Sequence, residues 1–288
     1  QAEHNSVLRP LYRKEKEGAE LTILPVDQKG NFSLEEMEKA VRENTRAVIC
    51  THASNVTGNL YPAEQIGKLC RRHGLLFILD AAQSAGEAPI DMRKMYIDVL
   101  CFTGHKGLMG PQGTGGVCVD PQVKIPAFKV GGSGILSFDR EHPGCMPEAL
   151  EAGTLNIHGL AGLEAAFDYL QDTGLEKIME YENRLAEIFY EKIRKIPGVE
   201  VYGDFSLPGR TAVVSLNVAG FTSKEAGDLL AQRYEIATRA GVHCAPLIHQ
   251  ALGTMERGTL RFSFSRFNTE EEIHRAALAV KEIAGERE

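Results

Sequence analysis

One lysine, Lys106, stands between an apolar run and a glycine-rich loop. The apolar run, residues 97–102, predicts a short buried strand, and the loop at 110–116 is rich in glycine. In open α/β sheets, ligands bind at such strand ends. A lysine there can be a surface cation, contact a phosphate group, or form a Schiff base with a carbonyl cofactor. Taken alone, the lysine leaves these three alternatives open.

Polar side chains also follow other predicted strands. Asp80 comes directly after the apolar run 75–79, and a carboxylate at that depth needs a cationic partner. A protonated pyridine nitrogen is one such partner, whereas the alternative is an aspartate that caps the next helix. Thr103 and His105 flank a position where a phosphate could rest on backbone and side-chain donors. Simple turn chemistry is the alternative for this pair.

Strands and helices alternate through the first half of the chain. The predicted strands cover residues 20–27, 46–50, 75–79, 97–102 and 116–119, and the predicted helices cover residues 33–43 and 62–73. Ser33 with Glu36 has the spacing of a capping box, and Gly74 is a helix stop. Continuous apolar runs are typical of parallel strands buried on both faces. The alternation therefore predicts an α/β fold, a mostly parallel sheet with helices on both faces.

The second half predicts a smaller C-terminal α+β domain. Residues 129–147 are rich in glycine and proline and predict an irregular segment. The predicted helices then cover 159–170, 175–196 and 223–234, the last with Ser223 as N-cap, and the predicted strands cover 199–202, 212–218 and 259–264. A final helix begins at Thr269, where Glu272 completes a capping box. We expect a large domain at 1–172 and a small domain at 173–288.

Composition narrows the function classes. The 288 residues have a net charge of −7, from 32 basic and 39 acidic residues, which argues against nucleic acid or an anionic membrane as partner. No apolar run is long enough to span a bilayer, and the polar opening residues predict no signal peptide. The six cysteines are scattered without C-x-x-C spacing, so neither zinc nor a disulfide framework is expected. Most of them, Cys50, Cys101 and Cys118 included, are expected to be buried and inert, and a cytoplasmic protein is the default.

Several motifs together resemble a known family. Asp-Ala-Ala-Gln at 80–83, followed by Thr-Gly-His-Lys106, resembles the class V aminotransferases, which are pyridoxal-phosphate enzymes of fold type I. The resemblance is narrower to the branch of cysteine desulfurases and selenocysteine lyases. Glu-Ala-Gly-Thr at 151–154 is similar to that branch's segment contacting the cofactor phosphate of a neighbouring subunit. Residues 239–246 resemble its active-site cysteine loop, and 261–263 its substrate-carboxylate arginine.

The resemblance implies roles around a pyridoxal 5'-phosphate ring. Lys106 would form the Schiff base and act as acid and base toward the substrate. Asp80 would pair with the pyridine nitrogen, which strengthens the cofactor as an electron sink. Gln83 would donate to the phenolic oxygen, and His4 would stack on the ring.

Three further residues would hold the phosphate if the resemblance holds. Thr103 and His105 would bind it from within the chain. Thr154 would add a contact across a subunit interface, which implies a homodimer.

The remaining carried-over roles concern the substrate. Asn55 and Arg261 would hold its carboxylate, with Arg239 nearby, because a guanidinium fork grips a carboxylate through two bonds. Cys244 would be the nucleophile that takes sulfur from the substrate. Positive charge from His243 or Arg239 would favour its thiolate. The alternative is that Cys244 is a core thiol.

The resemblance therefore implies a cysteine desulfurase that forms alanine and an enzyme persulfide, with a small amino-acid substrate and a sulfur-acceptor protein as partners. Selenocysteine lyase or another class V reaction is the alternative among enzymes. A catalytically silent remnant that persists as a binding or scaffold domain is the alternative outside them. The family's first portion, with a Gly/Thr-rich phosphate cradle, has no counterpart ahead of His4, so an exposed sheet edge is expected.

Overall fold

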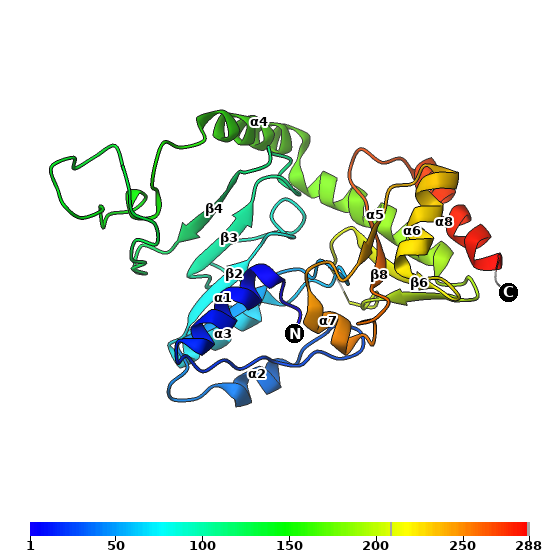
Figure 1. Cartoon of the computed structure of the whole chain (residues 1–288), viewed down its shortest axis with the longest axis horizontal. Coiled ribbons are helices and arrows are strands. Elements are labelled where there is room, and N and C mark those ends of the chain that lie inside the picture. The colour runs from blue at the N-terminus through cyan, green and yellow to red at the C-terminus, as the bar shows by residue number, and fades with distance from the viewer. Residues whose placement is uncertain (208, 287–288) are drawn as a thin grey trace.

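Two four-stranded sheets, one in each half of the chain, organise the fold (Figure 1). The structure is a computed structural model, and it describes residues 1–207 and 209–286. The first sheet has the strand order β1-β2-β3-β4, and the second has the order β5-β6-β8-β7. No helix within the described ranges is long and apolar enough to cross a membrane.

The first sheet confirms the predicted mostly parallel arrangement. Its strands are β1 (Ala47–Thr51), β2 (Leu76–Asp80), β3 (Val99–Thr103) and β4 (Gly115–Val119). The first three are parallel, and β4 runs antiparallel at the edge beside β3. Phe77 and Leu79 on β2 are fully buried, whereas Leu76 is exposed and Ile78 is half-buried. The expected burial of this apolar run on both faces was therefore wrong, because only one face of β2 is fully covered. Among the described residues β1 pairs only with β2, so its other edge has no strand beside it.

Local capping explains most of the helices around this sheet. The helices are α1 (Asn5–Lys16), α2 (Leu34–Ala40), α3 (Ala63–His73) and α4 (Ile157–Thr173), with a short 3-10 turn at Glu148–Leu150. Ser33 accepts a hydrogen bond from the backbone N–H of Glu36, 3.3 Å away, as its position predicts. Gly74 ends α3 in the left-handed conformation, with φ +65°, where glycine has no steric penalty.

Three expectations for the first half were wrong. Residues 20–27 form no strand, because no strand among the described residues pairs with them. The predicted helix from residue 33 ends at Ala40 instead of residue 43, since Val41 turns to extended backbone. Helix α1 was not predicted; the side chain of His4 caps it by accepting a hydrogen bond from the N–H of Ser6, 3.1 Å away.

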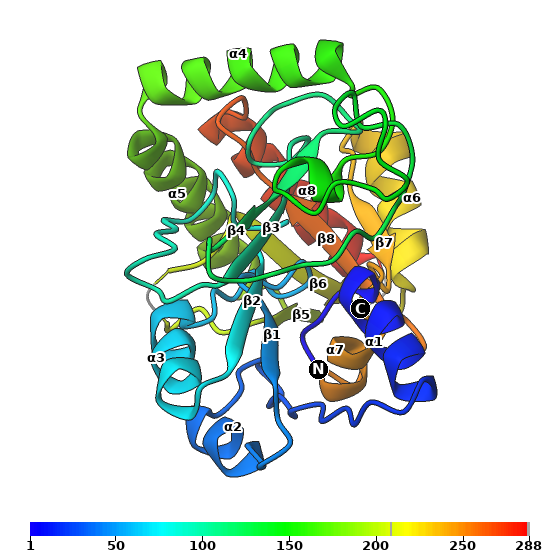
Figure 2. The ribbon, with the colours of Figure 1, turned by 90° about the vertical axis from the view of Figure 1, so that its left-hand side faces the viewer.

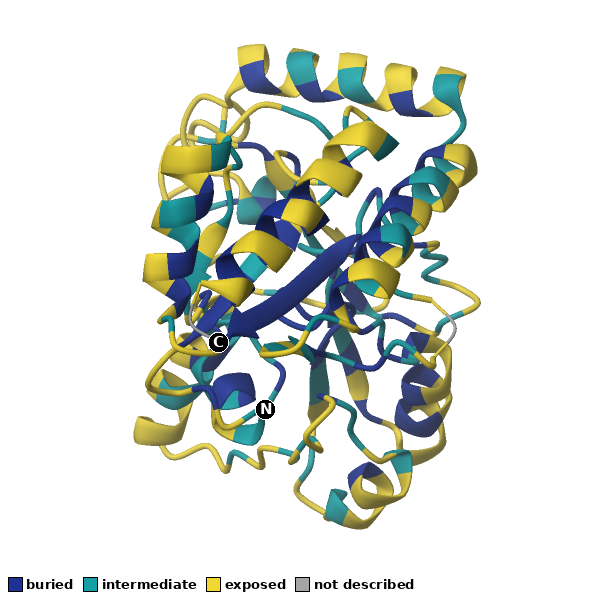
Figure 3. Ribbon diagram, turned by 90° about the vertical axis from the view of Figure 1, so that its right-hand side faces the viewer, coloured by how far each residue is buried: buried dark blue, intermediate teal, exposed yellow. Residues whose placement is uncertain are grey.

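The second sheet is antiparallel and lies under helices, as predicted for an α+β unit. Its strands are β5 (Val199–Tyr202), β6 (Val213–Val218), β7 (Arg239–Gly241) and β8 (Thr259–Ser263), and its neighbours are α5 (Leu175–Ile193), α6 (Ser223–Tyr234), α7 (Pro246–Ala251) and α8 (Glu270–Gly285). All six residues of β6 are buried. Figure 3 shows the buried residues on the inner faces of the covering helices. These faces form a core of their own, with Phe189, Leu216 and Leu260 fully buried.

The caps in this half are partly as expected. Thr269 and Glu272 form the predicted capping box of α8. The N-cap of α6 is Thr222, which forms a capping box with Glu225, and not Ser223 as predicted. Strand β7 and helix α7 were not predicted. They are short, and their stability depends on packing against distant elements, which local patterns do not report.

Contacts from the loop after β1 join the two halves. This loop, residues 52–59, is almost entirely buried. The Oγ of Ser215 on β6 donates to the Val56 carbonyl oxygen, and Nη1 of Arg210 donates to Oδ1 of Asn59 at 3.0 Å. Helix α7 also lies near the N-terminus of the chain, as Figures 1 and 2 show, and its Ile248 packs in the core of the first half. The division at residues 172 and 173 stays a prediction.

Candidate active site

The candidate residues of the first half meet at one edge of the first sheet. In the register of the sheet, Thr51 on β1 pairs with Asp80 on β2, and Asp80 pairs with Cys101 on β3. The loops that follow these strands therefore start side by side. Those loops contain Asn55, Asp80 with Gln83, and Lys106. The structure thus brings together residues that are far apart in the sequence, at the strand ends where α/β proteins bind ligands.

Lys106 lies in a tight turn directly after β3. The turn is closed by a hydrogen bond of 2.7 Å from the Gly110 N–H to the Gly104 carbonyl oxygen. Burial lowers the pKa of Lys106, and the nearby Arg261 cation lowers it further, whereas the Asp80 carboxylate opposes this change. A lysine with a lowered pKa has more of the neutral amine that attacks carbonyl groups. The lowered pKa supports the reactive alternative, whereas the residue as a whole is exposed, so the role of Lys106 stays a prediction.

Asp80 and His4 belong to the same electrostatic neighbourhood. Burial lowers the pKa of His4, Lys106 lowers it further, and Asp80 opposes both. Oδ1 of Asp80 accepts a hydrogen bond from the Ala82 N–H at 2.9 Å. Residues 82–87 form turns and not a helix, so the helix-capping alternative for Asp80 is wrong. Gln83 lies in these turns and is half-buried.

The residues predicted to hold a phosphate are only partly together. Oγ1 of Thr103 and Nδ1 of His105 are hydrogen-bonded at 2.8 Å, so they form one polar unit beside Lys106. Thr154 is exposed in the loop before α4. Within the described ranges, no recorded hydrogen bond joins Thr154 to the other candidates. Its predicted role requires a second subunit and stays a prediction.

A network of hydrogen bonds links the predicted substrate residues across the two halves. Nη1 of Arg261 on β8 donates to the Asn55 carbonyl oxygen at 2.9 Å. Nδ2 of Asn55 donates to the His243 carbonyl oxygen at 2.7 Å. Nε of Arg261 is buried and has no hydrogen-bond partner among the described residues. A buried donor without a partner is costly, and a bound carboxylate would satisfy it.

Cys244 is held on a loop between β7 and α7. Cys244 is exposed, so the alternative that it is a core thiol is wrong. Both His243 and Cys244 have positive φ, +49° and +58°, a region that residues other than glycine rarely adopt. The Cys244 carbonyl oxygen accepts a hydrogen bond from the Asn5 N–H at 2.7 Å. The loop is therefore tied to the start of α1, next to His4.

The charge predicted for His243 was wrong. The residue is buried, and burial is the main cause that lowers its pKa to about 3, with Arg261 adding to the effect. Nε2 of His243 donates to the Thr259 carbonyl oxygen at 3.0 Å. A neutral imidazole does not attract a thiolate. The other predicted source of positive charge, the Arg239 guanidinium, does lie beside the thiol: its Nη2 is 4.0 Å from Sγ of Cys244.

The other cysteines differ in how far they are buried. Cys50 and Cys70 are buried, and burial raises the pKa of both thiols, which makes them inert. Cys101 was expected to be buried and is only half-buried. Cys118 was expected to be buried and is exposed, because β4 is the edge strand of its sheet and burial there is incomplete.

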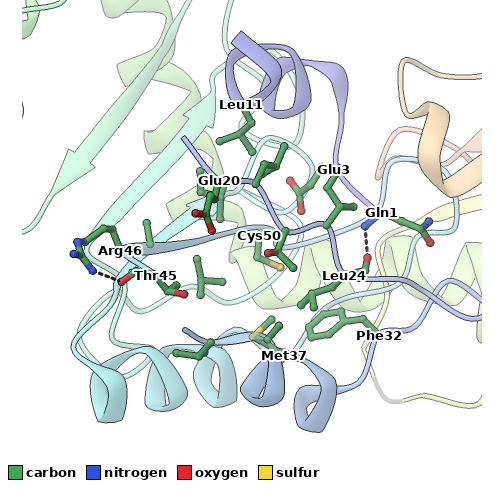
Figure 4. Close-up of a pocket in the computed structure, with 18 of the residues that line it drawn as sticks. Gln1, Glu3, Leu11, Glu20, Leu24, Phe32, Met37, Thr45, Arg46 and Cys50 are labelled. Carbon is green, nitrogen blue, oxygen red and sulfur yellow. Dashed lines mark hydrogen bonds between the residues drawn. The ribbon is translucent and has the colours of Figure 1, made fainter. Parts of the chain in front are cut away.

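A cavity of about 490 Å³ lies on the other side of β1 from β2 (Figure 4). Its wall is mostly apolar and includes Leu24, Phe32 and Met37. The N-terminal amine of Gln1 donates to the Leu24 carbonyl oxygen at its rim, 2.8 Å away. None of the candidate site residues lines this cavity, so it is separate from the chemistry around Lys106.

Acidification is expected to destabilise the fold through its buried histidines. Burial lowers the pKa of His52 to about 4, whereas an unfolded histidine titrates near about 6.5. Between these values the unfolded chain binds a proton that the folded chain does not. The free energy of unfolding therefore falls as pH falls through this window. Urea unfolding at about pH 7 and about pH 4.5 measures the loss.

A histidine substitution isolates that contribution. His52→Asn is expected to reduce the loss by about 2 kcal/mol. His158→Asn, at an exposed position, is the matched control and is expected to leave the loss unchanged. Equal pH dependence in the parent and the His52 variant would contradict the assignment.

The fold and the site together define a class of protein. The strand ends of the mostly parallel sheet gather a lysine, an aspartate and an imidazole. The small antiparallel unit adds a cysteine and arginines. This arrangement is that of an α/β enzyme whose candidate site is built from both halves of the chain. The chain matches the family described as aminotransferase class V over residues 1–276. It belongs to that family.

The similar proteins are named as cysteine desulfurases. A probable cysteine desulfurase of Methanothermobacter thermautotrophicus is 34% identical over 98% of this chain and 72% of that protein. A cysteine desulfurase of Synechococcus elongatus is 35% identical over 98% of this chain and 45% of that protein. The solved apo cysteine desulfurase of Thermococcus onnurineus aligns with a TM-score of 0.87 and 32% identity, over 99% of this chain and 71% of that one.

Proposed function

We propose that the chain is a pyridoxal-phosphate-dependent cysteine desulfurase, which converts L-cysteine to L-alanine and leaves a persulfide on Cys244. The observation that supports this most is the position of Cys244. Its exposed thiol stands on a loop tied to the N-terminus of α1 and beside Arg239. That loop faces the same neighbourhood as Lys106, Asp80 and His4. The names of the relatives agree with this chemistry.

The residues present fit the cofactor. Lys106 supplies an amine with a lowered pKa, and Asp80 supplies a carboxylate within electrostatic reach of it. Thr103 and His105 supply donors for a phosphate, and His4 supplies an aromatic ring near the lysine. With Gln83 these groups would hold pyridoxal phosphate, which supplies an electron sink that weakens the bond between Cβ and sulfur in the substrate.

The chain's own residues then have separate tasks. Arg261 and Asn55 would orient the substrate carboxylate, with the unpartnered Nε of Arg261 as a donor. The Cys244 thiolate would attack the substrate sulfur, so that a sulfur–sulfur bond forms as the Cβ–S bond breaks. The electron pair of the broken bond stays with Cβ, and a proton returned there completes alanine. Lys106 would move that proton.

We also propose the finer features of the assembly. Thr154 would contact the phosphate of a second subunit, so the active form would be a homodimer. A sulfur-acceptor protein would take the sulfur from the exposed Cys244, and the protein would act in the cytoplasm. Its negative net charge gives no attraction to nucleic acid or anionic membranes.

Substrate turnover tests the proposed function. The chain is incubated with pyridoxal phosphate and L-cysteine, and alanine and sulfide are measured after reduction. Equal formation of the two is expected, because each broken Cβ–S bond yields one of each. Selenocysteine and a keto-acid acceptor are compared under the same conditions. Faster turnover of selenocysteine, or amino-group transfer without sulfide, would assign a different class V reaction.

A further inference from the structure

Two turns pack backbone to backbone beside Lys106. A Cβ built on Gly86 would lie 2.3 Å from the Gly107 carbonyl oxygen. A Cβ built on Gly107 would lie 2.7 Å from the Ala85 carbonyl oxygen. Gly107 does not adopt positive φ, so backbone conformation does not explain the glycine. It is required by space, because the turn after β2 lies directly on the turn of Lys106.

Glu87 occupies the space that Gly107 leaves. A Cβ on Gly107 would lie 2.8 Å from Cγ of Glu87 and 3.3 Å from its Oε1. The N–H of Glu87 donates to the Ser84 carbonyl oxygen at 2.9 Å, which holds the turn. The carboxyl group therefore rests on the residue that follows Lys106. Sequence patterns did not single out Glu87, since the contact joins two separate turns.

Charged groups from three elements act electrostatically on this carboxyl group. They are Lys106 after β3, Arg261 on β8 and Glu182 on α5. Burial is the main cause that raises the pKa of Glu87 to about 8, Glu182 adds to the rise, and the two cations oppose it. Glu182 is itself buried and accepts a hydrogen bond from the Arg266 N–H at 2.8 Å. Glu87 is thus neutral at neutral pH and becomes an anion in mild alkali.

We propose that Glu87 is a positioning residue for Lys106: its carboxyl group, packed on Gly107, holds the Lys106 ammonium group in its charged form once the carboxyl is ionised. The Glu87 proton leaves to solvent, and the new anion attracts the lysine cation across the shared turn. If the proposed function is right, this interaction limits the alkaline range in which Lys106 is a free amine and keeps it able to return a proton to the substrate.

Direct labelling of Lys106 tests the inference without any turnover. The cofactor-free chain is methylated with formaldehyde and cyanoborohydride across a pH series, and Lys106 is followed by peptide mass spectrometry. Only the neutral amine reacts. Glu87→Gln keeps the shape but cannot ionise, so Lys106 is expected to react about threefold to tenfold faster than in the parent at about pH 9. At about pH 6.5 the two rates are expected to agree.

Two further variants give the controls. Glu182→Gln keeps an acceptor for Arg266 but removes a charge that opposes ionisation of Glu87, so the slowing of Lys106 is expected to begin at lower pH. Glu43→Gln, at an exposed position, is expected to match the parent. Superimposable profiles for the parent and Glu87→Gln would overturn the inference, and so would an equal change in Glu43→Gln. Because labelling needs no cofactor or substrate, the outcome is independent of whether cysteine is turned over.

Discussion

Replacement of Cys244 by alanine is expected to reduce sulfide release from cysteine on the order of a thousandfold or more, because it removes the thiolate that attacks the substrate sulfur in the proposed reaction. The exposed thiol and the nearby Arg239 guanidinium are the physical basis. The cofactor is expected to bind as in the parent, since Cys244 is not among the groups placed to hold it. Sulfide assays and the visible absorption spectrum measure these two outcomes separately.

Another exposed cysteine provides the matched control. Cys118 is exposed on β4, in the other sheet from β7, and Cys118→Ala is expected to keep the parent's turnover. Mass spectrometry of the parent after a single addition of cysteine is expected to locate the extra sulfur atom on Cys244. Parent-like sulfide release by the Cys244 variant would remove this residue from the mechanism and with it the proposed desulfurase.

Replacement of Lys106 by alanine is expected to abolish both covalent attachment of pyridoxal phosphate and turnover, again on the order of a thousandfold or more. The turn after β3 places this amine near Asp80, and its lowered pKa suits attack on a carbonyl carbon. After borohydride reduction, the parent is expected to retain the cofactor's mass on the peptide that contains Lys106. The variant is expected to retain none.

Two control variants test whether the amine of Lys106 itself is required, or whether a cation at this position or any exposed lysine is sufficient. Lys106→Arg keeps a cation beside Asp80 but has no amine that attacks carbonyl groups, so it is expected to fail in the same way as alanine. Lys124→Ala removes an exposed lysine after β4 and is expected to bind the cofactor normally. Retained cofactor mass in either Lys106 variant would show that another lysine is the site of attachment.

In our proposal, Glu87 affects the protonation of Lys106 in the same site. Lys106 is expected to react as the resemblance implies, but its reactive pH range depends on a carboxyl group from a neighbouring turn. That turn also faces Glu182 on α5. The small unit supplies Arg261, and through Glu182 it also affects the charge of Glu87. In this proposal, groups from both halves of the chain therefore set the protonation of Lys106.

The sequence alone predicted the strand ends at which the candidate residues lie. Apolar runs ending in Asp80 and shortly before Lys106 predicted strands, and the structure has β2 and β3 there. Caps such as Ser33 and Thr269 were predicted because a cap depends on residues three positions apart. The family was also identifiable, since its motifs are contiguous. These features are all local in the chain, and local spacing is what a sequence displays.

Only the tertiary structure decided the state of those residues. His243 is neutral because it is buried under β8, and Cys118 is exposed because β4 is an edge strand. Residues 20–27 are not a strand because, in the part of the chain that the structure describes, no strand pairs with them. The contact of Glu87 with Gly107 joins two turns separated by a whole strand. Burial, charge state and strand pairing are set by neighbours distant in sequence, so no local pattern could predict them.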